Sequence, residues 1–197
     1  MKDLEAWSIE KSAELYGIKN WGKEYFTVNA SGNVEIRPRG AKGPGVDLHS
    51  LVESTKEQGI GFPVLYRFND ILRHRVRSLY SAFSSAIEEH GYGGKYFPAF
   101  PIKVNQQRGV VDVLRKTGEE FSMGLEVGSK PELIAVLAIH DDDSALLLCN
   151  GYKDREYIEL ALMSKKVGRR PIIIIEKYTE LQTVSYTHLT LPTICSV

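Results

Sequence analysis

One lysine in the sequence occupies a position that suits covalent chemistry. Lys103 follows an apolar run in "KYFPAFPIKVNQQRG" and comes just before a polar turn. If this run is a strand, alternation places Lys103 on the face opposite Ile102 and Val104. An amine removed from water loses its charge more easily and becomes a nucleophile toward an aldehyde. The residues therefore permit a lysine that forms a Schiff base, but a solvated lysine at the end of a strand is the more common arrangement.

A carboxylate occupies the corresponding place in the next apolar run, "FSMGLEVGS". Alternation puts Glu126 on the same face as Gly124 and Gly128, and the apolar residues on the other face. If the strands close into a barrel, Lys103 and Glu126 both point inward. The two glycines would then leave space for a bound molecule beside the amine.

The second half of the sequence provides the elements that would hold these two side chains. Apolar runs alternate with helical segments in the order "YFPAFPIKV", "QQRGVVDVLRKTG", "FSMGLEVGS", "KPELIAVLAIH", "ALLLCNG", "DREYIELALMSKKVG" and "RPIIIIEK". This alternation predicts parallel βαβ units, and the run of isoleucines is typical of a strand that is buried on both faces. In such sheets chemistry gathers at the carboxyl ends of the strands, where Lys103 and Glu126 would lie.

The first 66 residues predict a small α+β segment. They contain a helix from Asp3 to Tyr16, a hairpin in "YFTVNASGNVEIRP" and a capped helix in "DLHSLVESTKEQG", and a strand follows in "FPVLYRF". The glycine- and proline-rich stretch from Arg37 to Gly45 favours a flexible connector over a phosphate-binding loop. The reason is that no strand precedes this stretch and no Gly-Lys-Ser/Thr sequence follows it.

A longer helix should begin at Asn69 or Asp70 and lead into a second domain, predicted to span residues 67–183. Apolar residues recur in this helix at helical spacing, which indicates a face that packs against the core. These residues are Leu72, Val76, Leu79, Phe83 and Ile87.

Composition limits the class of protein. The chain has 197 residues, 43% of them hydrophobic, so it can bury a core. The 25 basic residues balance 25 acidic ones, which leaves no overall field to attract nucleic acid or an acidic membrane. Cys149 lies in an apolar run and is expected to be a small buried residue, so no disulfide framework is predicted. No signal peptide or membrane span is recognisable, and we expect a cytoplasmic protein.

Other polar residues have more than one interpretation. Ser129, three residues before Glu132, favours a capping box at the start of a helix over a catalytic hydroxyl. Asn150 and Tyr152 follow a strand and could line the cleft, but an Asn-Gly pair is at least as typical of a turn. The five histidines show no ligand spacing, and a metal site made by this segment alone is not expected.

Three segments together resemble the biosynthetic arginine decarboxylases, which are pyridoxal-phosphate enzymes of the alanine-racemase-like barrel class. The segments are "PIKVNQ" from Pro101, "GLEVGSKPELIAVLA" from Gly124 and "CNGYKDREYIELAL" from Cys149. Their order and spacing agree with the family. The resemblance extends back through "VDLHSLVE" and forward to about "IIIIEKYTELQTV", so it covers most of residues 15–183.

This resemblance implies the amino-terminal half of a pyridoxal-phosphate-binding (β/α)8 barrel of the TIM type, preceded by the small α+β segment. It implies that Lys103 holds the cofactor as a Schiff base and, less directly, that Glu126 lies beside the cofactor ring. The implied reaction is decarboxylation of L-arginine to agmatine and CO2, which leads to putrescine and spermidine. Members of the family are also described with magnesium and as homo-oligomers.

Two alternatives remain beside arginine decarboxylation. The substrate could be another basic amino acid, ornithine or diaminopimelate, because the residues that select the side chain lie mostly beyond Thr183. The chain could also be a non-catalytic homologue that regulates polyamine enzymes, although the intact "PIKVN" around Lys103 argues against this alternative.

The sequence departs from the family pattern toward its end. A complete barrel needs about 250 residues, and the family's glycine-rich phosphate-binding turn belongs to later sequence. The last residues, "VSYTHLTLPTICSV" from Val184 to Val197, are not expected to continue the helix of "KYTELQT". We expect this tail to be non-native, and the chain to be an inactive and aggregation-prone fragment.

Overall fold

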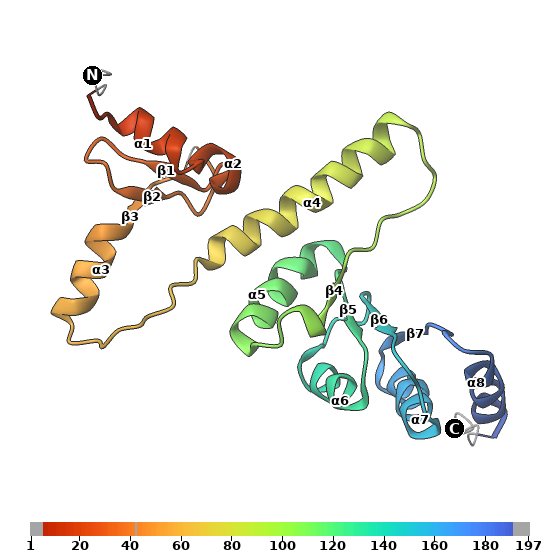
Figure 1. The fold of residues 1–197 in the computed structure, drawn as a ribbon. Helices are drawn as coiled ribbons and strands as arrows, with labels where there is room; N and C mark the ends of the chain where they lie inside the picture. Colours follow the sequence, from red (N-terminus) through yellow and green to blue (C-terminus); the bar gives the residue numbers. More distant parts are fainter. Residues whose placement is uncertain (1–5, 42, 191–197) are drawn as a thin grey trace. The chain divides into compact units, whose positions relative to one another are not determined.

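The computed structural model describes residues 6–41 and 43–190, with residues 188–190 described by their backbone alone (Figure 1). The chain forms two compact units, Met1–Arg75 and Val76–Val197. Helix α4 (Asn69–Glu89) begins in the first unit and continues in the second. The domain boundaries expected from the sequence, after residues 66 and 183, stay predictions.

The first unit contains a small antiparallel sheet with short helices around it. Its strands follow the order β1-β2-β3. The elements are α1 (Ile9–Leu15), α2 (Ile18–Gly22), β1 (Phe26–Val28), β2 (Val34–Ile36), β3 (Val46–Asp47) and α3 (Leu48–Glu57). The predicted hairpin is confirmed by the pairing of Phe26 with Ile36. The capped helix is confirmed as well, because the Asp47 carboxylate accepts the Ser50 N–H at 2.9 Å.

Two predictions for this unit are wrong. Helix α1 begins at Ile9 and residues 6–8 before it are not helical, because the Ser8 hydroxyl accepts the Lys11 N–H at 3.2 Å and caps the helix there; the predicted start at Asp3 lies outside the described residues. The stretch "FPVLYRF", residues 62–68, forms no strand. No neighbouring strand pairs with it in the described chain, and Tyr66 instead donates a hydrogen bond to Thr55 Oγ1 at 2.7 Å.

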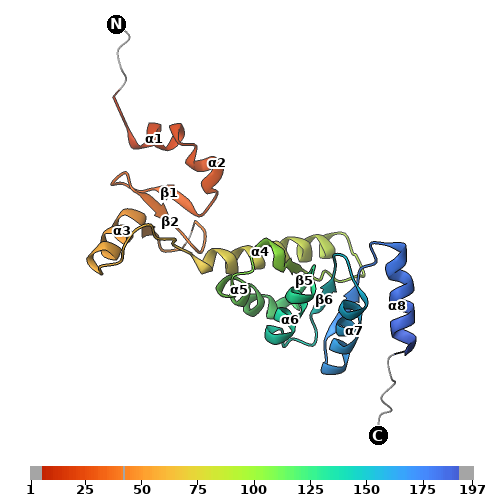
Figure 2. The same cartoon turned by 60° about the horizontal axis from the view of Figure 1, so that its bottom comes forward.

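The second unit is built on a parallel sheet of order β4-β5-β6-β7. Each strand is followed by a helix, which confirms the predicted α/β class and its βα repeats (Figures 1 and 2). The elements are β4 (Ala99–Pro101), α5 (Arg108–Gly118), β5 (Gly124–Val127), α6 (Lys130–Ile139), β6 (Leu146–Cys149), α7 (Arg155–Ser164), β7 (Arg170–Ile173) and α8 (Tyr178–Thr190). Short 3-10 turns follow β4, α5 and α7, namely η1 (Ile102–Val104), η2 (Glu119–Phe121) and η3 (Lys165–Val167).

The core of this unit lies between one face of the sheet and helices α5, α6 and α7. Leu125, Val127, Leu147 and Cys149 form the sheet side of the core and are almost completely buried. Residues of the opposite parity lie on the other face, where Glu126 pairs in register with Pro101 and Leu148. Glu126 lies on this second face near the end of β5, and Lys103 follows the end of the neighbouring β4.

The expectation that the isoleucine run is buried on both faces is wrong. Ile172 is 46% exposed, whereas Ile173 packs against the core. The reason is that β7 is the last strand of the described sheet, and its side chains alternate between the helix-covered face and an open face.

The apolar stripe of α4 is also less buried than expected. Val76 is buried, but Leu79 is 47% exposed and Phe83 is 45% exposed. Aromatic stacking holds the second-unit part of the helix in place, with ring centres 4.2 Å apart for Tyr80 and Phe121. Phe83 also stacks on Tyr96, with ring centres 4.0 Å apart, although its side chain remains partly exposed.

Helix α8 continues through Thr190, so the expectation that helical structure stops at Val184 is wrong. Thr187 is buried, and the Arg155 guanidinium lies 5.6 Å from the ring centre of Tyr186. These contacts connect the end of α8 to the neighbouring α7. The non-native origin of the tail stays a prediction, and its residues 191–197, including Cys195, lie outside the described chain.

In the described part of the chain, no helix combines the length and the apolar character that crossing a membrane requires.

Candidate functional site

Lys103 lies at the carboxyl end of β4, as predicted, but not within the strand. Strand β4 ends at Pro101, and Lys103 is the middle residue of the 3-10 turn η1. The predicted alternation therefore fails here, since Ile102 is 5% exposed and Val104 is 68% exposed. The turn nevertheless keeps the amine at the edge of the sheet where the other strand ends meet.

Lys103 and Glu126 are brought together. The Nζ atom of Lys103 lies 3.8 Å from Oε1 of Glu126, which projects from the third residue of β5. The Lys103 side chain is 66% exposed and the Glu126 side chain only 19% exposed. The amine is therefore solvated, which is the more common arrangement for a lysine at the end of a strand, because η1 carries Lys103 beyond the strand. What the site presents is an accessible amine facing a largely buried carboxylate.

The two glycines beside Glu126 do not have the same function. A β-carbon at Gly124 would collide with the carbonyl oxygen of Leu146, so this glycine allows β5 and β6 to approach closely and leaves no free space. A β-carbon at Gly128 would come no nearer than 3.6 Å, to Oε2 of Glu132. Only Gly128 thus agrees with the prediction of room next to the carboxylate.

Asn150, the first residue after β6, contacts Glu126 and also shapes a turn. Its side-chain Nδ2 donates to Glu126 Oε1 at 3.3 Å, while its Oδ1 accepts the N–H of Gly151 at 2.9 Å. The turn interpretation is therefore confirmed and the amide also contacts Glu126, while the cleft-lining function of Asn150 stays a prediction. Tyr152 is 74% exposed, and its ring centre lies 3.5 Å from the Lys177 amine.

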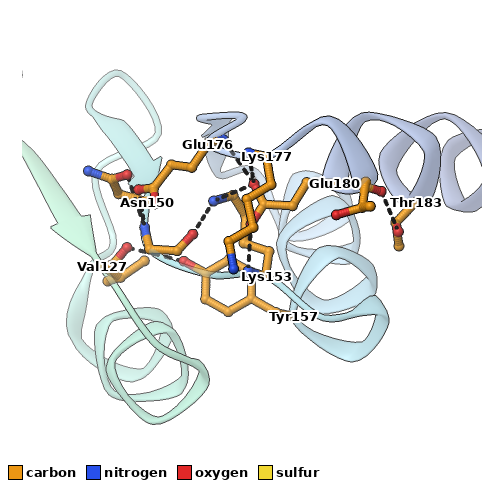
Figure 3. A network of polar contacts seen from close by, with 10 residues as sticks. Val127, Asn150, Lys153, Tyr157, Glu176, Lys177, Glu180 and Thr183 are labelled. Carbon is orange, nitrogen blue, oxygen red and sulfur yellow. Dashed lines mark hydrogen bonds and ion pairs between the residues drawn. The ribbon is translucent and has the colours of Figure 1, made fainter.

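A buried ion pair that the sequence analysis did not identify lies behind this turn (Figure 3). The side chain of Lys153 is fully buried and that of Glu180 is 3% exposed, with 3.4 Å between Nζ and Oε2. Glu180 Oε1 accepts the Lys153 N–H at 3.0 Å, and Oε2 accepts the Glu176 N–H at 2.9 Å. The Lys153 amine also donates to the Gly151 carbonyl. The pair thus links the loop after β6 to the start of α8.

The charge of Glu180 is stabilised by these donors. Burial by itself would raise the pKa of the Glu180 carboxyl, but the N–H groups of Glu176 and Lys153, together with the Lys153 ammonium, lower the pKa to about 2. In the sequence, only a weak feature indicates this ion pair: Glu180 is an acidic residue in the first turn of a helix that follows a strand.

Ser129 and Cys149 have the structural functions that were predicted. The Ser129 hydroxyl accepts the Glu132 N–H at 3.4 Å and caps α6, while Glu132 accepts the Gly128 N–H at 2.7 Å. Cys149 is completely buried, and burial raises the pKa of its thiol to about 11. Ser129 is therefore a helix cap and Cys149 a buried packing residue.

Known proteins resemble the chain along almost its whole length. The biosynthetic arginine decarboxylase of Prochlorococcus marinus (strain MIT 9313) is 45% identical over 184 residues, which are 93% of this chain and 28% of that protein. The enzyme of the same name from Bacteroides thetaiotaomicron is 46% identical over 182 residues, 92% of this chain and 29% of that protein. The chain therefore spans less than a third of the length of these relatives.

A solved structure gives the same result. The crystal structure of the biosynthetic arginine decarboxylase from Campylobacter jejuni superposes with a TM-score of 0.80 at 32% identity, over 90% of this chain and 30% of that one. Residues 73–195 match the family model described as the pyridoxal-dependent decarboxylase, pyridoxal binding domain. This match covers more than half of the chain and includes β4 to β7 with both Lys103 and Glu126, and the chain therefore belongs to the family of pyridoxal-dependent decarboxylases.

Proposed function

We propose that this chain carries the lysine-bearing part of an arginine decarboxylase, which converts L-arginine to agmatine and CO2 on the way to polyamines. The observation that carries the proposal is the pairing of the Lys103 amine with Glu126 at the strand ends of a pyridoxal-binding domain. The relatives that match the chain over nine-tenths of its length are named for the same reaction.

Lys103 and Glu126 fit the aldehyde end of pyridoxal phosphate. When bound, this cofactor supplies an aldehyde that can bond to an amine and a ring that withdraws electrons from the α-carbon of an amino acid. Lys103 offers an accessible primary amine, which would hold the aldehyde between turnovers. Glu126 offers a largely buried carboxylate 3.8 Å from that amine, which can orient the amine by charge attraction.

Finer features of the whole protein belong to the same proposal. We expect a homo-oligomer in the cytoplasm that acts on free L-arginine and uses magnesium. In the described part of the chain, no group of three His, Cys, Asp or Glu side chains is arranged to hold a metal ion. The magnesium ligands would therefore come from elsewhere, and the 197-residue chain alone remains predicted to be inactive.

Covalent trapping of Lys103 tests the proposal. The chain is incubated with pyridoxal phosphate, reduced with borohydride, digested and mapped by mass spectrometry. We expect the adduct on Lys103 to exceed that on Lys130 several-fold. Lys130 is a suitable internal reference, because the hydrogen bonds that its amine donates to Asp154 and Glu156 raise the pKa of the amine and keep it protonated.

Lys103→Arg is the matched control, because it keeps the positive charge but cannot bond to the aldehyde. Its adduct at position 103 should disappear, while labelling of Lys130 remains the same. Equal labelling of Lys103 and Lys130 in the parent chain would contradict the proposed function.

A further inference from the structure

We infer that Asn150 is a positioning residue for the Lys103 amine, acting through Glu126. The inference rests on the proposed function, because that function requires the Lys103 amine to be held in one geometry beside Glu126. Asn150 does not contact the amine in any hydrogen bond of the described structure. It donates instead to Oε1 of Glu126, the same oxygen atom that lies 3.8 Å from Lys103 Nζ.

The need for such a residue follows from the exposure of the two partners. The Lys103 side chain is 66% exposed and has four rotatable bonds, so it pays rotamer entropy whenever it is held in one place. A carboxylate that also moved would add to this cost. Because Asn150 fixes the largely buried Glu126, only the lysine has to be ordered when the pair forms.

Asn150 can fix Glu126 because it is itself held from several directions. Its backbone N–H donates to the Val127 carbonyl at 2.8 Å, which extends the pairing of β5 with β6 by one residue. Its Oδ1 accepts the Gly151 N–H at 2.9 Å, and Glu176 Oε1 accepts the same N–H at 2.9 Å. The amide plane is thereby oriented with Nδ2 toward Glu126.

A turn function alone would not use this donor. The Asn-Gly turn needs only the Oδ1 acceptor and the left-handed Gly151, whose φ is 72°. The Nδ2 contact with a carboxylate on the neighbouring strand is additional to the turn. The two functions can therefore be separated by a residue that keeps an acceptor but is too short to reach Glu126.

Asn150→Ser is that variant, and its effect is measured on the pH dependence of Lys103 labelling by pyridoxal phosphate and borohydride. Only the neutral amine attacks the aldehyde, and a nearby carboxylate favours the ammonium form. We expect Asn150→Ser to move the midpoint of the labelling curve of Lys103 to lower pH, because the carboxylate is then no longer held beside the amine. The midpoint for Lys130 should stay in place.

The same substitution in a Glu126→Ala background shows whether Asn150 acts through Glu126. We expect no further change in the Lys103 midpoint there, because the positioned carboxylate is already absent. Asn29→Ser is the matched control in the first unit. Asn29 also accepts backbone N–H groups and donates to a carboxylate, that of Asp47, and its loss should leave the Lys103 midpoint unchanged.

An unchanged Lys103 midpoint in folded Asn150→Ser, or the same movement in both backgrounds, would overturn the positioning function. Circular dichroism confirms that each variant is folded. The pH midpoint of Lys103 labelling can be measured even if pyridoxal phosphate labels other lysines more strongly. Weak labelling of Lys103 in the parent chain would thus count against the proposed function, and an absent coupling would count against Asn150.

Discussion

At the scale of single residues, the chemistry of the site depends on which charges are accessible and which are buried. The Lys103 amine is open to a ligand, whereas the Lys153–Glu180 pair is closed to solvent. Removing one partner from a buried pair leaves an uncompensated charge in a poorly solvated place. The buried pair therefore supports the loop that carries Asn150 and Gly151, while the exposed amine is free for chemistry.

Glu180→Gln should lower the free energy of unfolding by about 3 kcal/mol at neutral pH, because it leaves the Lys153 ammonium buried without its counter-charge. Urea denaturation followed by circular dichroism measures this loss. Glu53→Gln is the control, since Glu53 forms a comparable ion pair with Lys56 but is 47% exposed. Its effect should be much smaller because water solvates both charges.

The same pair predicts part of the acid sensitivity of the chain. The pKa of Glu180 is lowered from 4.5 to about 2 in the folded chain, so the unfolded chain binds more protons between these values. Stability contributed by Glu180 is complete above about pH 4.5 and is lost as the pH falls toward 2. Equal acid sensitivity in the parent and in Glu180→Gln would contradict this assignment.

At the scale of elements, two of the helices beside the parallel sheet begin at residues whose side chains cap them. Ser129 caps α6 and Asp154 caps α7, each by accepting a backbone N–H three residues later. These caps fix where each helix starts and therefore how long the preceding loop at the strand ends can be. Strand β4 differs, because Lys103 lies in a 3-10 turn that the alternation of apolar residues did not indicate.

Ser129→Ala should cost about 1 kcal/mol of stability, because the Glu132 N–H at the start of α6 loses its acceptor. Thermal or urea unfolding measures the change. Ser84→Ala is the matched control on the exposed face of α4, where alanine should be neutral or stabilise the helix by up to about 0.5 kcal/mol. A cap function for Ser129 would be refuted by equal effects of the two substitutions.

At the scale of the whole molecule, the described sheet ends at β7, and one face of its last strand is open. The chain spans less than a third of the length of its relatives, and the sheet contains four parallel strands. A terminal strand presents unpaired N–H and C=O groups that can pair with another chain. The exposed Ile172 adds apolar surface at the same place.

Ile172→Lys should reduce aggregation of the purified chain, because a charge on an edge strand opposes pairing between chains. Light scattering against concentration measures the effect. Ile134→Lys is the control, since Ile134 is 59% exposed but lies on α6, away from the strand edge. If both lysine variants suppress scattering equally, general apolar exposure and not the β7 edge causes the aggregation.

The sequence by itself determined the βα order, the helix caps and the choice of Lys103 and Glu126. Caps and strand–helix alternation are local patterns, and parallel strands place their carboxyl ends at one edge whatever their detailed packing. The resemblance of three short segments to arginine decarboxylases indicates the cofactor chemistry from sequence alone.

Only the tertiary structure decided the exposure of the amine, the donor from Asn150 and the Lys153–Glu180 pair. Each of these depends on contacts between residues more than 20 positions apart in the chain or on where a strand ends in space. The pattern of one segment cannot encode how much of a side chain its neighbours cover. For that reason the sequence identified the lysine and its carboxylate, and the fold decided how they are held.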